Sequence, residues 1–115
     1  MSFLDTAKIF HHPEHYMEWY TTGDTHAPVS VKIDLTNICN HSCPGCIDHL
    51  LINNDSRSLE YPVIEKLFAS LKTLKVKSIQ LTGGGEPTAH PLFDEIVNLA
   101  WQYGFDIGLI TNGSL

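Results

Sequence analysis

The chain has 115 residues, with 7 Lys and Arg against 13 Asp and Glu, so its formal net charge is -6. This length allows one small domain, and the acidic balance argues against nucleic acid as a partner, because phosphate backbones are bound by clustered Lys and Arg. The sequence has no run of about 18 apolar residues, which predicts no membrane span, and its N-terminus does not resemble a secretory signal, so we expect a cytoplasmic protein.

Residues 1–28 predict a lead-in segment that packs on the domain after it. Pro13 suits the first position of a helix, and a short helix over residues 14–20 can follow it. Residues 29–35 then alternate apolar and polar side chains at every step, which predicts a strand with two unlike faces. All the cysteines of the chain come directly after this strand, and a polar loop over residues 51–60 follows them.

Two helices and two more strands are expected in the rest of the chain. Apolar residues recur at intervals of three and four from Pro62 to Leu74, which predicts an amphipathic helix. Residues 78–82 predict a second strand, which ends at a Gly-Gly-Gly-Glu-Pro turn over residues 83–87. We expect Pro91 to open a second helix that stops at Gly104, and residues 105–111 to form a third strand.

The predicted order β-α-β-α-β is that of an α/β fold with parallel strands, in which right-handed crossovers place both helices on one face of the sheet. The loops that follow the three strands then meet at one edge, where α/β folds place their sites. Polar residues share one face of the first two strands, which favours a partial (β/α) barrel with a wet lumen over a doubly wound sheet. These residues are Ser30, Lys32, Asp34, Ser78, Gln80 and Thr82. Lys32 and Asp34 either line the lumen near a polar substrate or pair with charges on neighbouring strands.

The cysteines Cys39, Cys43 and Cys46 are spaced as C-x3-C-x2-C. Thiolates are soft ligands that select zinc, copper(I) or iron–sulfur clusters. Three of them can hold three corners of a [4Fe–4S] cluster and leave the fourth iron open to a small molecule. The same thiols also suit a Cys3His zinc site that uses His41 or His49, or three buried and inert side chains. Spacing alone leaves these alternatives open.

The turn at residues 83–86 adds a second unusual feature at the same edge, because glycines let the backbone approach a ligand closely. With these features the sequence resembles the radical SAM superfamily. The resemblance rests on the cysteine spacing after the first strand, on Gly84-Gly85-Glu86 after the second, and on Thr111-Asn112-Gly113 after the third.

The resemblance implies that the three cysteines bind a [4Fe–4S] cluster whose open iron is chelated by S-adenosylmethionine. Reductive cleavage of this cofactor would yield a 5′-deoxyadenosyl radical, which takes hydrogen from a substrate that the sequence does not identify. A reductant such as flavodoxin or ferredoxin is implied as well. By the same resemblance Gly84, Gly85 and Glu86 hold the methionyl ammonium group, the backbone at Gly45 faces the adenine, and Asn112 lies near the cofactor.

The sequence departs from the family pattern in two ways. An aromatic residue usually stands just before the last cysteine, where this chain has Gly45. The family barrel also has six β/α units, and three strands are expected here. We therefore expect residues 29–115 to be the N-terminal half of a radical SAM core domain, incomplete for turnover alone. The alternatives are a non-enzymatic zinc-stabilised module and a truncated remnant that holds no cofactor.

Overall fold

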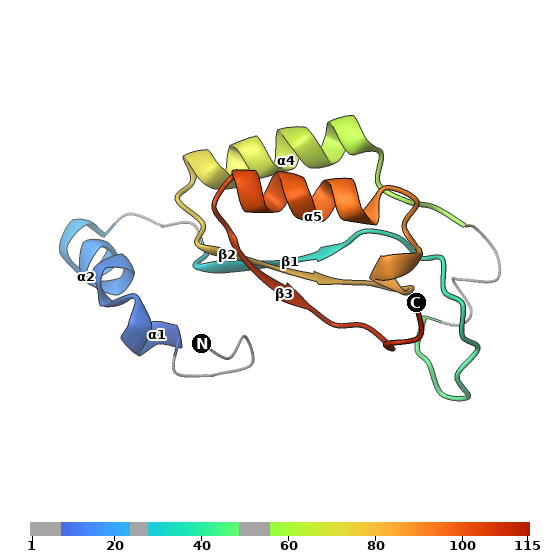
Figure 1. Cartoon of the computed structure of the whole chain (residues 1–115). Coiled ribbons are helices and arrows are strands. Elements are labelled where there is room, and N and C mark those ends of the chain that lie inside the picture. Colours follow the sequence, from blue (N-terminus) through green and yellow to red (C-terminus); the bar gives the residue numbers. More distant parts are fainter. Residues whose placement is uncertain (1–7, 24–27, 49–55) are drawn as a thin grey trace.

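The computed structural model describes residues 8–23, 28–48 and 56–115. In this part of the chain β1 (Ser30–Asp34), β2 (Ser78–Thr82) and β3 (Asp106–Leu109) form a parallel sheet in the order β1-β2-β3. Helices α4 (Tyr61–Thr73) and α5 (Phe93–Gln102) lie side by side on one face of the sheet (Figure 1). The predicted α/β fold and the shared face of the two helices are confirmed.

The core lies between these two helices and the sheet. In α4, Ile64, Phe68 and Leu71 repeat at helical spacing and are buried, and in α5 Ile96 and Ala100 do the same. The inward face of the sheet contributes buried residues from β1 and β2, namely Ile33, Ile79 and Leu81. Each Ile, Leu or Phe side chain of this set stabilises the fold by about 1.5–3 kcal/mol when fully buried. This packing holds the strand ends, and hence their loops, in fixed positions.

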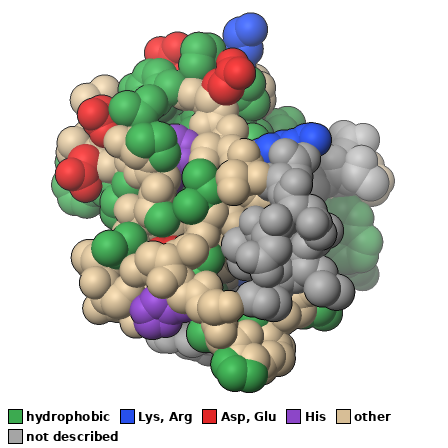
Figure 2. Space-filling model, turned by 90° about the vertical axis from the view of Figure 1, so that its right-hand side faces the viewer, with side chains coloured by type: hydrophobic (Ala, Val, Ile, Leu, Met, Phe, Trp, Pro, Cys, Tyr) green, Lys and Arg blue, Asp and Glu red, His purple; other side chains and the backbone are tan. Residues whose placement is uncertain are grey.

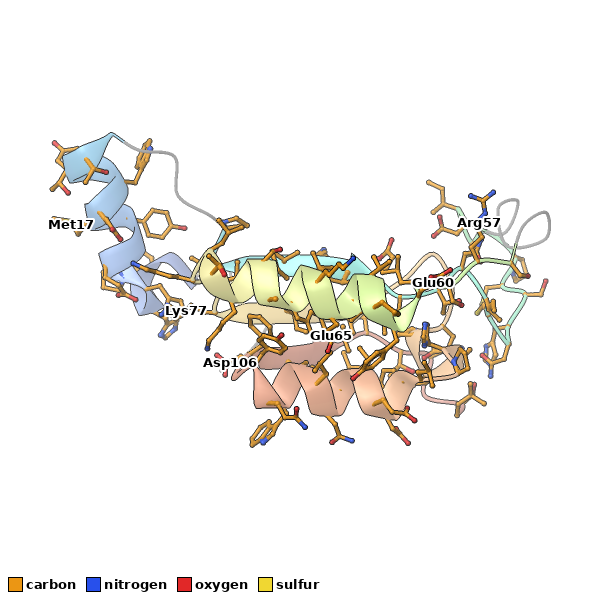
Figure 3. All side chains as sticks on the ribbon, turned by 90° about the horizontal axis from the view of Figure 1, so that it is seen from above. Met17, Arg57, Glu60, Glu65, Lys77 and Asp106 are labelled. Carbon is orange, nitrogen blue, oxygen red and sulfur yellow. The ribbon has the colours of Figure 1, made fainter. Side chains whose placement is uncertain are left out.

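An arm of two helices precedes the sheet. Helix α1 (Lys8–His11) was not predicted, whereas α2 (Pro13–Thr22) begins at the expected proline. It ends at Gly23, whose φ of 71° lets its N–H donate to the Trp19 carbonyl. The arm lies beyond the amino ends of the strands, away from α4 and α5 (Figure 1). Seen from above, Lys77 and Asp106 lie at the end nearest the arm, and Arg57 lies at the opposite end (Figure 3).

Helix α5 starts later than expected, so the prediction that Pro91 opens it is wrong. A short 3-10 helix, η1 (Pro87–Ala89), comes first, and the buried His90 follows it. His90 Nδ1 accepts a hydrogen bond from the Leu92 N–H at 3.1 Å, and Nε2 lies 2.9 Å from the Leu59 carbonyl oxygen. Leu92 has φ -116° and ψ 32°, so regular helix begins only at Phe93. The stop at Gly104, which has φ 73°, agrees with the prediction.

The helix-free face of the sheet is only partly as predicted. Lys32 and Asp34 on β1 are exposed, and among the described residues neither forms an ion pair. Ser78 and Gln80 on β2, expected to face water, are 8% and 4% exposed. Strand β2 is the middle strand, so neighbours on both sides cover it.

No helix in the described part of the chain is long and apolar enough to cross a membrane.

Candidate functional site

Three loops meet at the carboxyl edge of the sheet. We call them the cysteine loop (residues 36–48), the glycine loop (residues 83–86) and the β3 loop (residues 110–115). Each follows a parallel strand, so all three lie on the right-hand side of Figure 1. Figure 2 looks onto this edge, where backbone and uncharged polar atoms cover most of the centre and acidic side chains stand toward the upper and left rim. The predicted convergence of the three loops is confirmed.

The glycine loop packs directly against the cysteine loop. The Gly85 N–H donates to the Thr36 carbonyl at 3.0 Å, and the Glu86 N–H donates to the Ile38 carbonyl at 2.8 Å. A Cβ atom at Gly85 would lie 2.1 Å from the Ile38 carbonyl oxygen, far inside van der Waals contact. At Gly84 the nearest atom would be 3.7 Å away, which is ordinary contact. The sequence predicts a close approach of these glycines to a ligand. The close approach that the structure shows is that of Gly85 to the neighbouring loop of the chain itself.

Glu86 is the buried charged group of the site, with 3% of its surface exposed. Its Oε1 accepts hydrogen bonds from the Thr88 N–H at 3.2 Å, the Thr88 hydroxyl at 2.6 Å and the Thr111 hydroxyl at 2.6 Å. Its Oε2 accepts from the Asn112 N–H at 2.8 Å. Burial raises the pKa of Glu86, but these hydrogen bonds outweigh burial and hold the pKa below its usual value. The carboxylate is therefore ionised and already bound by donors of the chain.

Asn112 connects the β3 loop to the cysteine loop. Its side-chain N–H donates to Asn40 Oδ1 at 2.9 Å, and its Oδ1 accepts from the Ser114 hydroxyl at 2.7 Å. Asn40 completes this set by donating from Nδ2 to the Ser114 hydroxyl oxygen at 2.7 Å. These side chains are exposed to solvent. Because Asn40 follows Cys39 in the chain, the β3 loop contacts the cysteine loop beside its first thiol.

The three cysteines lie on the surface of the cysteine loop. All are free, with Cys43 exposed and Cys39 and Cys46 half-buried, so the alternative of three buried thiols is wrong. A backbone hydrogen bond of 3.1 Å from the Cys46 N–H to the Cys43 carbonyl forms a tight turn between two of them. Within the described residues the structure does not gather these thiols, or any His, Asp or Glu, into a metal-binding group. His49 lies outside the described residues.

The donor set still fits a soft metal centre in its chemistry, since three thiols within one loop are ligands for zinc or an iron–sulfur cluster. Gly45, between Cys43 and Cys46, has φ 107°, a backbone conformation that side-chain-bearing residues rarely adopt. This explains in physical terms why the chain has glycine where an aromatic residue is usual. Its own site is open, because no atom lies within 4 Å of where a Cβ would stand.

A cavity of about 570 Å³ opens at the carboxyl end of β1, beside Gly84. Its polar lining includes Asp34 from β1, Asp48 from the cysteine loop and Arg57 from the segment before α4. Sequence reasoning did not identify Asp48 or Arg57, because neither belongs to a periodic pattern or a recognised motif. It also did not identify Asn40 and Ser114 as partners of Asn112. Only the fold, which brings residues 74 positions apart into contact, reveals them.

Comparison with known proteins agrees with this geometry. The family model of the radical SAM superfamily matches residues 33–115, which include all three loops. An S-adenosylmethionine-dependent nucleotide dehydratase of Selenomonas ruminantium is 35% identical over 85 residues, covering 74% of this chain and 30% of that protein. A PqqA peptide cyclase of Methylorubrum extorquens is 33% identical over 87 residues, covering 76% of this chain and 22% of that protein.

Among solved structures, Streptococcus suis SuiB bound to S-adenosylmethionine has a similar fold. The TM-score is 0.68 at 20% identity, and the match covers 93% of this chain and 24% of that one. The chain thus spans less than a third of the length of these relatives. With the family model matched over most of its length and the fold shared, the chain belongs to the radical SAM superfamily.

Proposed function

We propose that this chain binds a [4Fe–4S] cluster through Cys39, Cys43 and Cys46, as part of an enzyme that uses S-adenosylmethionine. The observation that carries the proposal is the family match over residues 33–115, which includes all three cysteines of the chain. When bound, the cluster and cofactor would supply the radical that removes hydrogen from a substrate. The chain's own residues provide the ligands, the shape of the site and its electrostatics.

The cofactor would lie against the edge that the three loops form. A cationic ammonium group suits carbonyl oxygens at strand ends, and Gly84 and Gly85 place backbone there without side chains. The ionised carboxylate of Glu86 makes this edge negative, which favours the same group. The backbone at Gly45 and the side chain of Asn112 stand on the two loops that flank it.

The relatives differ in what they act on, since one is a nucleotide dehydratase and another a peptide cyclase. We propose radical-based modification of a polar substrate as the shared reaction class. Residues 29–115 are the cofactor-binding part of the core domain in this proposal, and residues 1–28 form its lead-in segment. A flavodoxin or ferredoxin would supply the electron.

Anaerobic reconstitution with iron and sulfide tests the proposal. The reduced protein is expected to give the EPR signal of a [4Fe–4S] cluster, and adding S-adenosylmethionine is expected to change it. Replacing any one cysteine by serine should abolish the signal, because three thiolates are needed to hold three irons.

The variant His41→Ala is the matched control, because it changes the same loop without removing a thiol. It should leave the cluster signal intact, whereas a Cys3His zinc module that uses His41 would lose its metal. Stoichiometric zinc without a cluster, or a signal insensitive to S-adenosylmethionine, would contradict the proposal.

A further inference from the structure

The loops at the carboxyl edge form a closed ring of contacts within the chain. The glycine loop is bound to the cysteine loop through the backbone, by the Gly85 and Glu86 N–H groups. The β3 loop is bound to the glycine loop through the Glu86 carboxylate. The β3 loop is bound to the cysteine loop through Asn112 and Asn40. Each loop therefore contacts the other two.

Glu86 is the strongest link of this ring. A carboxylate has about four lone-pair positions, two on each oxygen. The described residues donate three hydrogen bonds to Oε1 and one to Oε2. Two of the four come from the β3 loop, 25 and 26 residues further along the chain, at 2.6 and 2.8 Å. Hydrogen bonds to a buried charged acceptor are stronger than those between neutral, exposed groups. The carboxylate thus fixes both the side chain of Thr111 and the backbone of Asn112.

We propose that Glu86 is a positioning residue, which sets the place of Thr111 and Asn112 and thereby holds the β3 loop at the carboxyl edge of the sheet. The carboxylate acts on the site through the loops that its hydrogen bonds join. The path runs from Glu86 Oε2 to the Asn112 N–H, and from the Asn112 side chain to Asn40. This role rests on contacts within the chain, so it holds whether or not the cluster is bound.

Hydrogen exchange of the whole protein before reconstitution tests this role without requiring activity. In Glu86→Gln the amide cannot accept from all four donors, so the β3 loop should exchange faster by about tenfold or more, as expected for losing a hydrogen bond to a charged acceptor. Thr111→Val removes one donor to the carboxylate and leaves the charge in place, but it also removes the acceptor of the Gly113 N–H. Its readout is therefore the Asn112 amide, which donates to Glu86 and should exchange faster. Thr111→Ser retains the hydroxyl and should restore slow exchange. The amides of β2 should stay protected in every variant.

Glu65→Gln is the matched control, since it makes the same chemical change on the exposed face of α4 (Figure 3) and should leave the β3 loop unchanged. A direct ligand role predicts the opposite result. Glu86→Gln would then weaken S-adenosylmethionine binding with normal exchange, and Thr111→Val would have no effect. Should Glu86→Gln fail to fold, the Thr111 pair decides alone, and normal exchange of the Asn112 amide in Thr111→Val overturns the proposal.

Discussion

The glycine loop and the cysteine loop stand next to each other at the same edge, yet they are built differently. The glycine loop is half-buried or buried throughout, and its backbone and the Glu86 carboxylate are held by hydrogen bonds within the chain. The segment from Asn40 to Gly45 is exposed, and its thiols are not gathered within the described residues. The glycine loop has its shape from contacts within the chain. The cysteine loop has three thiol ligands, and a metal centre bound to them would determine its shape.

Substitution of the glycine loop should have the largest effect on stability. Gly85→Ala places a Cβ 2.1 Å from the Ile38 carbonyl oxygen, so one of the two loops must move. We expect the free energy of unfolding to fall by about 3 kcal/mol or more, at the upper end of overpacking costs. Urea denaturation measures this loss of stability as a lower midpoint concentration of urea, with an unchanged m-value.

Gly84→Ala is the control for this prediction, because its added Cβ would stand 3.7 Å from the nearest atom. It should cost less than about 1 kcal/mol, because this distance is ordinary van der Waals contact and nothing has to move. If the two alanine variants were equally stable, the close packing of Gly85 against the cysteine loop would be refuted.

Removing the charge of Glu86 should have the next largest effect. Glu86→Gln is expected to lower the free energy of unfolding by about 1.5–3 kcal/mol at neutral pH, the range for hydrogen bonds to charged groups. The folded-state pKa of Glu86 lies below that of the unfolded chain. The stabilisation is therefore present above the unfolded pKa of about 4.3 and is lost as the pH falls through the folded pKa.

The pH series separates this effect from a general loss of packing. Stability of the unsubstituted protein should fall more steeply in acid than that of Glu86→Gln, so the two curves should converge there. Curves that stay parallel down to strong acid would show that the charge of Glu86 does not stabilise the fold.

Much of the architecture could be predicted from alternation and helical spacing alone. Strand β2 was predicted at residues 78–82, and the meeting of the three loops follows from parallel strands. Contacts between residues far apart in sequence could not be predicted in this way. The four hydrogen bonds of Glu86 and the crowding at Gly85 depend on how the loops pack, and neither leaves a periodic signal. For the same reason Gly84 and Gly85 look equivalent in the sequence.

The start of α5 also depends on a contact that sequence patterns do not predict, in this case between residues close in the chain. Proline suits a first helical position, which made Pro91 the natural choice. The ring of His90 instead accepts from the Leu92 N–H and holds that residue outside the helix. A side-chain contact thus displaced a boundary that local propensity had placed two residues earlier.

Substituting Gly45 should have a smaller effect on stability than either change above. Its φ of 107° makes Gly45→Ala strained, at a cost of order 1–3 kcal/mol if the backbone could not adjust. The surrounding segment is exposed, so we expect the loop to rearrange and the measured loss to be below about 1 kcal/mol. Cluster content after reconstitution should fall more clearly than stability. If urea denaturation showed the whole cost of about 1–3 kcal/mol, this segment would be as rigid as the glycine loop.

The smallest change is expected at Asn40, where the ring of contacts is exposed to solvent. Asn40→Ala removes the hydrogen bonds to Asn112 and Ser114, but water replaces them, so the free energy of unfolding should change by no more than about 0.5 kcal/mol. Asn40→Asp keeps the oxygen that accepts from Asn112. Its free energy of unfolding should lie between those of the unsubstituted protein and Asn40→Ala. A loss at Asn40 as large as that of Glu86→Gln would mean that the cysteine loop is held as firmly as the glycine loop. A small loss leaves the cysteine loop dependent on what its thiols bind.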